Sequence, residues 1–99
     1  MRVTVPHHTT RAKAREIVER KISVLLAQFG EHAGDVRHDW TGDTFQFKGT
    51  ARGFTVEGTV EITDAEVVID GKLPMLARPF EPRIQQAVER EAETMFRTA

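Results

Sequence analysis

The chain has few side chains that could act as a nucleophile. Cysteine is absent, and the single serine, Ser23, lies in an expected helix without the strand-turn-helix sequence that exposes a catalytic serine. Threonines are frequent, but none stands in a motif with a general base, and their positions suit helix caps, turns and strand faces. We therefore expect a protein that is not an enzyme and that needs no cofactor.

The histidines and aspartates do not form a recognisable metal site. His7 and His8 are adjacent, so their side chains diverge in an extended chain, and His38 stands between two apolar residues of an expected strand. Zinc ligands usually occur in pairs at short, suitable spacing. We expect no metal, a packed His38 at the edge of the core, and an Asp43 side chain that supports its own turn.

Length and composition are those of one small domain. The chain has 99 residues, of which 39% are hydrophobic and 29% charged, and residues 1–99 are expected to share one core. Fourteen Lys and Arg oppose 15 Asp and Glu, with the two signs interleaved, so we expect no nucleic-acid partner. No apolar run is long enough to cross a bilayer, and the first residues do not read as a signal peptide, which favours a cytoplasmic location.

Alternating apolar and polar residues between Val36 and Leu73 predict four antiparallel strands. One register keeps the apolar side chains on a single face, with Trp40 opposite Phe45, Gly49 opposite Phe54, and Ile62 opposite Val67. The same register sets Lys72 opposite Glu57 on the other face, which is a favourable pair of opposite charges. We expect that mixed-charge face to be solvated or to bind a partner.

Two amphipathic helices are expected to cover the apolar face of the sheet. Arg11 to Phe29 and Pro82 to Arg97 carry apolar residues at helical spacing, and Thr9 or Thr10 offers a hydroxyl that caps the first helix. Val3 to Pro6 is expected to form an additional first strand. The predicted fold class is α+β, in the order β-α-β-β-β-β-α, with both helices on one face of an antiparallel sheet.

Gly58 and Gly71 face each other in the predicted register and remove two side chains from the apolar face. The ring of Phe45 on the neighbouring strand is expected to fill this gap, because strand glycines often mark close packing. The alternative is a pocket for a small apolar or acyl ligand between the sheet and the C-terminal helix. Its lining would be Trp40, Phe45, Phe47, Val56, Gly58, Gly71 and Leu73.

The segment from Leu73 to Phe80 links the sheet to the last helix and is unusually apolar. Its two prolines prevent regular structure throughout, so the side chains of Met75, Leu76 and Phe80 are expected to be only partly covered. These side chains could contact a partner or an apolar surface, or they could pack against the helix.

The order of the elements is that of the helix-grip arrangement in TATA-binding-protein-like folds, and several motifs resemble one family. These motifs are Pro6-His7-His8, Ala14-Arg15, Trp40-Thr41-Gly42-Asp43-Thr44-Phe45, Gly58-Thr59-Val60, and Gly71-Lys72-Leu73-Pro74-Met75-Leu76 followed by Arg78-Pro79-Phe80 and Arg83-Ile84. Over nearly its whole length the chain thereby resembles the small polyhydroxyalkanoic acid system proteins, which are described as encoded in granule-associated gene regions. The motifs are structural signatures, so the resemblance brings no catalytic residues with it.

The resemblance implies an association with bacterial polyester storage. We expect a non-catalytic accessory protein in the cytoplasm or at storage granules, where it contacts the polyhydroxyalkanoate granule or a granule-associated protein. The alternative is the apolar ligand-binding protein described above. A homodimer that forms by pairing of edge strands is a further alternative that the sequence leaves open.

Overall fold

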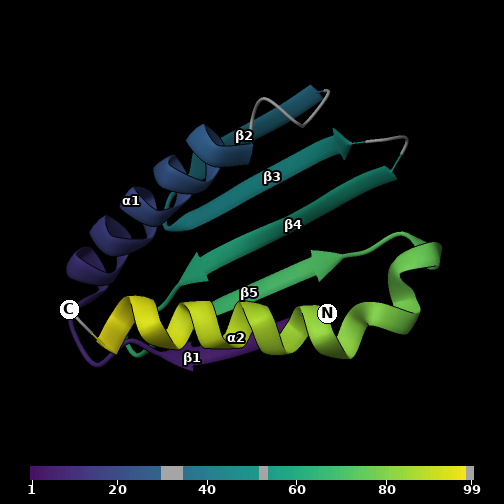
Figure 1. Cartoon of the computed structure of the whole chain (residues 1–99). Coiled ribbons are helices and arrows are strands. Elements are labelled where there is room, and N and C mark those ends of the chain that lie inside the picture. The colour runs from purple at the N-terminus through teal and green to yellow at the C-terminus, as the bar shows by residue number, and fades with distance from the viewer. Residues whose placement is uncertain (30–34, 52–53, 98–99) are drawn as a thin grey trace.

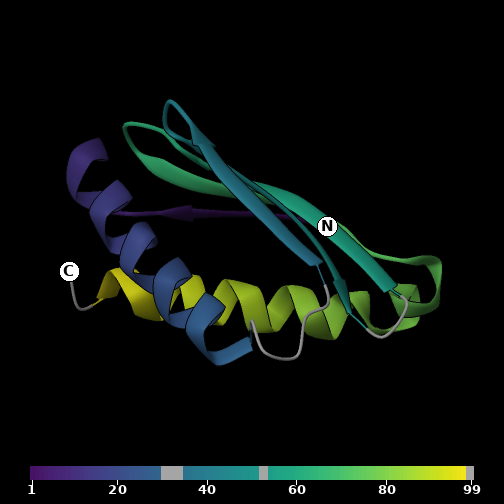
Figure 2. The same ribbon diagram turned by 90° about the horizontal axis from the view of Figure 1, so that it is seen from above.

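The computed structural model of the protein describes residues 1–29, 35–51 and 54–97. Its elements in chain order are β1 (Arg2–Pro6), α1 (Arg11–Phe29), β2 (Asp35–Thr41), β3 (Thr44–Ala51), β4 (Phe54–Ile62), β5 (Glu66–Lys72), the 3-10 helix η1 (Met75–Phe80) and α2 (Glu81–Arg97). The strands form one antiparallel sheet in the order β1-β5-β4-β3-β2, and both helices lie on one face of it (Figures 1 and 2). The α+β class and the order of the strands and helices predicted from the sequence are confirmed.

The core lies between the sheet and the two helices. Its buried side chains are Val3, Val5, Ile62 and Val67 from the sheet, and Ala14, Val18, Ala92 and Phe96 from the helices. The backbone N–H of Lys13 donates to Thr10 Oγ1 at 3.1 Å, so Thr10 is the residue that caps α1. Among the described residues, neither helix is both long and apolar enough to cross a membrane.

The register of the β3–β4 hairpin differs from the prediction. Gly49 pairs with Val56 rather than with Phe54, because the two strands stay paired as far as Ala51 and Phe54 and leave only residues 52–53 to connect them. The difference is two residues, so every side chain keeps its predicted face. The other predicted pairs are confirmed: Trp40 with Phe45, Ile62 with Val67, and Glu57 with Lys72.

The shifted register changes which ring packs on Gly58. Gly58 pairs with Gly71 as predicted, but its neighbour on β3 is Phe47 and not Phe45. A Cβ atom at position 58 would lie 2.5 Å from the backbone oxygen of Asp70 and 2.9 Å from Cζ of Phe47. The Phe47 ring therefore occupies the space that the absent side chain leaves, and a larger residue would displace backbone.

We expect Gly58→Ala to lower the free energy of unfolding by about 1–3 kcal/mol, because the added methyl overpacks the sheet against backbone. Urea denaturation measures this change. Gly71→Ala is the matched control, since its Cβ would meet only the flexible end of Met1 at 3.4 Å and the Glu57 backbone oxygen at 3.9 Å. An equal loss of stability in both variants would contradict the tight approach at Gly58.

Candidate functional site

Exposed apolar side chains gather at the end of the sheet where η1 lies. We name Met75, Leu76 and Phe80 the η1 surface; their side chains are 76%, 72% and 57% exposed. Phe54 and Val56, at the start of β4, are exposed at the same end of the sheet (Figure 1). These five are most of the seven large hydrophobic side chains that are exposed within the described ranges.

The conformation of η1 explains why its apolar side chains point to solvent. Pro74 is extended, with φ −60° and ψ 153°, and the chain then turns so that the Ala77 N–H donates to the Pro74 oxygen at 2.9 Å. Pro79 lies inside η1, and none of the six residues of this helix is buried. The connector predicted from the sequence is thus a short helix that presents Met75, Leu76 and Phe80 outward.

An apolar cavity of about 590 Å³ lies between the two helices and the sheet. Its walls include Val60, Val67 and Ile69 of the sheet, Val18, Ile22 and Leu25 of α1, and Val88, Ala92 and Met95 of α2. At its rim Lys21 Nζ lies 3.0 Å from Glu91 Oε2, an ion pair that joins α1 to α2. A cavity of this volume and lining is of the kind that accommodates small apolar ligands.

The predicted pocket residues lie elsewhere. None of the seven lines the apolar cavity, although all seven are within the described ranges. Three of them form a ring cluster on the sheet, in which Phe45 is buried and its ring centroid lies 5.3 Å from that of Trp40 and 6.1 Å from that of Phe47. Gly58 and Gly71 pair beside this cluster, whereas Val56 is exposed and Leu73 is half-buried beyond β5.

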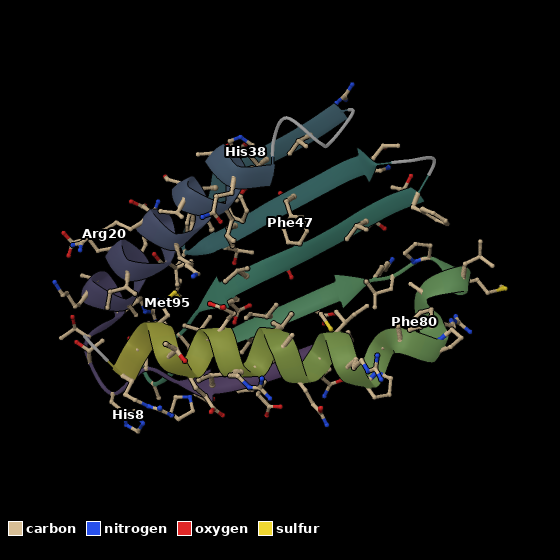
Figure 3. All side chains as sticks on the ribbon, viewed as in Figure 1. His8, Arg20, His38, Phe47, Phe80 and Met95 are labelled. Atoms are coloured by element: carbon tan, nitrogen blue, oxygen red, sulfur yellow. The ribbon has the colours of Figure 1, made fainter. Side chains whose placement is uncertain are left out.

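Met95 and Phe80 represent two different candidate sites. Figure 3 shows Phe80 on η1, directly before the start of α2. Met95 lies near the other end of α2, close to α1. The apolar helix residues that line the cavity belong to the stripes that predicted α1 and α2. The sequence predicted that these stripes pack in the core. The space between the two helices depends on how the helices cross, and the local pattern of apolar residues does not specify that crossing.

The polar face of the sheet also forms a shallow hollow, with a volume of about 650 Å³. Its charged residues are Arg37, Lys48 and Lys72 against Asp39, Glu57 and Asp70. Within this face Lys72 Nζ lies 3.8 Å from Glu57 Oε1. The equal numbers of positive and negative groups are those of the mixed-charge face predicted from the sequence.

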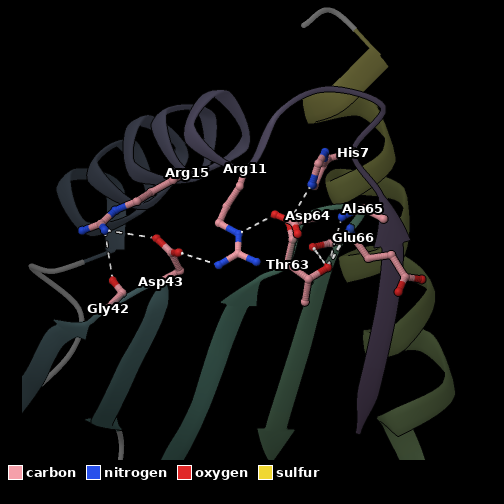
Figure 4. Close-up of polar contacts among 9 residues, drawn as sticks. All are labelled: His7, Arg11, Arg15, Gly42, Asp43, Thr63, Asp64, Ala65 and Glu66. Carbon is pink, nitrogen blue, oxygen red and sulfur yellow. Dashed lines mark hydrogen bonds and ion pairs between the residues drawn. The ribbon is translucent and has the colours of Figure 1, made fainter.

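At the end of the sheet opposite η1, two arginines of α1 bind the turns between strands (Figure 4). Asp43, expected to support only its own turn, contacts Arg11 Nη1 with Oδ2 and Arg15 Nη1 with Oδ1, each at 3.3 Å. Arg11 Nε donates to Asp64 Oδ1 at 2.9 Å, and Arg15 Nη1 donates to the Gly42 oxygen at 3.0 Å. These bonds connect the start of α1 to the β2–β3 and β4–β5 turns.

The two arginines are held in their charged form. Hydrogen bonds to Asp64 and then to Asp43 raise the pKa of Arg11 above its ordinary value, and a hydrogen bond to Glu19 is the main cause that raises the pKa of Arg15. The Arg15 guanidinium also lies 4.5 Å from the centroid of the Trp40 ring, a cation–π contact. The cluster therefore positions α1 on the sheet, and its carboxylates are already engaged.

His7, which the sequence brought forward only as a rejected metal ligand and as part of a motif, is a buried polar residue. Its exposed fraction is 1%, its Nε2 lies 2.9 Å from the Thr63 oxygen, and its Nδ1 accepts the Thr9 N–H at 3.2 Å. Because Nδ1 accepts, Nε2 carries the proton that bonds to Thr63. The alternation of β1, with Val3 and Val5 inward, was a signal that His7 continues the buried face. In the described part of the chain, no group of three or more His, Asp or Glu side chains could hold a metal ion.

We expect His7→Phe to lower the free energy of unfolding by about 1–3 kcal/mol, because the Thr63 oxygen and the Thr9 N–H would lose their buried partner. His8→Asn is the control, since His8 is exposed and has φ 54°, a conformation that asparagine tolerates. Urea denaturation of both variants at one pH measures the difference. A His7 variant as stable as the wild type would contradict the structural role of these two hydrogen bonds.

Comparison with known proteins gives one match. A family model described as "Putative polyhydroxyalkanoic acid system protein" matches residues 1–96, which include every described strand and all but the last residue of α2. No curated protein and no solved structure matches the chain significantly.

Proposed function

Because the chain belongs to the family of putative polyhydroxyalkanoic acid system proteins, we propose that it is a non-catalytic accessory protein that contacts polyhydroxyalkanoate granules through the η1 surface. The observation that carries this proposal is the exposure of Met75, Leu76 and Phe80 on a short helix that buries none of its residues. The lack of cysteine and the position of Ser23 inside α1 support a role without acyl transfer.

The η1 surface has the physical properties that binding to an apolar polymer requires. Burial of one such side chain contributes roughly 1.5–3 kcal/mol, so three that meet a polymer surface together can oppose the entropy cost of binding. β5 and α2 hold η1 at both of its ends, so little conformational freedom is lost on contact. Arg78 of η1 and Arg83 in the first turn of α2 are exposed, so they can remain hydrated while the apolar side chains are covered.

The test is sedimentation of the purified protein with washed polyhydroxyalkanoate granules. We expect the triple variant Met75→Ser, Leu76→Ser, Phe80→Ser to bind at least about tenfold more weakly than the wild type, because it loses most of the buried apolar area. Since none of the three residues is buried, the variant should keep its fold, and its circular dichroism spectrum and urea midpoint verify this.

Two control variants test whether loss of any exposed apolar side chain, or loss of a charge near the η1 surface, also weakens granule binding. Val24→Ser removes an exposed apolar side chain of α1, which is 49% exposed, and Arg78→Ser removes a charge beside the η1 surface. Both should sediment with granules as the wild type does. Equal sedimentation of the folded triple variant and the wild type, or no sedimentation above that of an unrelated protein, would contradict direct granule binding.

A second candidate function is the binding of a small acyl ligand, and the cavity of about 590 Å³ is the observation that favours it. The pocket predicted from the sequence lies between the sheet and the C-terminal helix alone, whereas this cavity has different lining residues and α1 also forms part of its wall. Lys21 could bind the carboxylate of the ligand in place of Glu91, while the aliphatic chain of the ligand contacts the apolar walls.

Titration with a dansyl-labelled undecanoic acid tests the acyl ligand. We expect Val60→Phe to weaken binding of this probe about tenfold, because the added ring occupies the cavity floor. Thr59→Phe is the matched control, since it adds the same ring to the same strand on the opposite face of the sheet. No saturable fluorescence change with the wild type, or an equal loss in both variants, would exclude this cavity as the site.

A further inference from the structure

We propose that the outer edge of β2 pairs with β2 of a second copy of this chain, giving a two-fold symmetric dimer with one continuous sheet. β2 and β1 are the two edge strands of the sheet. β1 has five residues and ends at Pro6, which has no N–H to donate to another strand. β2 is longer, with seven residues and no proline, and in the view from above α1 runs beside it and does not pass over it (Figure 2).

The hydrogen bonds of β2 identify the backbone groups that its outer edge presents. Trp40 N–H donates to Oδ1 of Asp39 at 2.9 Å and therefore does not pair with β3. In an antiparallel strand the N–H and C=O of one residue point to the same side, and this side alternates along the strand. Val36, His38 and Trp40 consequently present their N–H and C=O groups to the outer edge, while Arg37 and Asp39 direct theirs to β3.

The side chains of β2 are complementary to those of a second, antiparallel β2. With His38 on the two-fold axis, Arg37 lies opposite Asp39 of the second copy, and Val36 lies opposite Trp40 of the second copy. The charged pair lies on the polar face of the sheet and the apolar pair on the face that the helices cover. Each face of the continuous sheet therefore keeps its character across the two copies. Because the axis repeats each pair, the interface contains two ion pairs, as a self-complementary two-fold contact requires.

Asp39 has a different role in the separate chain and in the dimer. In the separate chain its carboxylate accepts the outward N–H of Trp40, which covers the strand edge. In the dimer that N–H donates to the Val36 oxygen of the second copy, and the Asp39 carboxylate is released to pair with Arg37 of the second copy. Pairing therefore replaces the hydrogen bond of Asp39, and the outward N–H groups of Val36, His38 and Trp40 all meet acceptors on the second copy.

The helix beside β2 supplies additional apolar surface next to this edge. Leu26 follows Arg15 by eleven residues, which is about three helical turns, so it lies on the same side of α1 as Arg15, which contacts Trp40 of β2. Leu26 is half-buried in the separate chain. The two-fold axis runs perpendicular to the sheet, so it places the α1 helices of the two copies on the same face, on either side of the new strand pair.

Sedimentation velocity of the full chain and of charge-reversal variants tests this proposal. We expect a wild-type dimer with a Kd of roughly 10–100 µM, as for a small interface, and Arg37→Asp or Asp39→Arg alone to weaken it about tenfold or more, because two attractive pairs become repulsive. The double variant Arg37→Asp, Asp39→Arg should dimerise like the wild type. An equimolar mixture of the two single variants should also dimerise, since every altered residue again meets an opposite charge.

His38→Pro tests the backbone pairing independently. It removes the outward N–H on the two-fold axis, and an edge strand tolerates proline at such a position, so we expect a folded monomer by circular dichroism and sedimentation. A wild-type monomer at about 0.5 mM would overturn the proposal, because a Kd of 100 µM predicts mostly dimer there. A dimer that every variant leaves unchanged would also overturn it and would place the contact on another surface. Neither result depends on granule binding.

Discussion

The structure depends on one constraint, which is that all five strands direct most of their apolar side chains to the same face of the sheet. Val3 and Val5 of β1 meet Ile62 of β4 and Val67 of β5 in one buried layer, and α1 and α2 are the only helices of the described chain long enough to cover it. The helices come from opposite ends of the sequence and lie toward opposite edges of the sheet (Figure 1). Their cover is incomplete, and this leaves a cavity between them and exposed apolar residues at one end.

The two ends of the sheet differ in how the chain connects them to the helices. At one end Arg11 and Arg15 bind Asp43, Asp64 and the Gly42 oxygen, so polar bonds determine where α1 lies. At the other end η1 connects β5 to α2 through two prolines and buries none of its side chains. The bonds of Arg11 and Arg15 place α1 on the sheet at one end, and the η1 end carries exposed apolar side chains. This separation is the physical reason to propose binding at η1.

Much of the fold could be predicted from the sequence, because strand alternation and helical period are local patterns. A register error of two residues at Gly49 left every face correct, since side-chain direction repeats every two residues, but it exchanged Phe45 for Phe47 as the ring on Gly58. The contacts of Asp43 with α1 were not predictable, because they join residues separated by 28 and 32 positions. The position of the cavity depends on the angle between two helices, which no local pattern specifies. Hence the exposure of the η1 residues, a local feature, could be predicted from the sequence, whereas the residues that line the cavity could not.

Methionine oxidation distinguishes the candidate surfaces in one measurement, because Met75 belongs to the η1 surface and Met95 lines the cavity. The protein is treated briefly with hydrogen peroxide, alone and with polyhydroxyalkanoate granules, and the sulfoxide at each position is quantified by mass spectrometry of tryptic peptides. If η1 contacts the granule, Met75, which is 76% exposed in the separate chain, becomes protected while the oxidation rate of Met95 does not change. An unchanged oxidation rate of Met75 in granule-bound protein would contradict contact through η1.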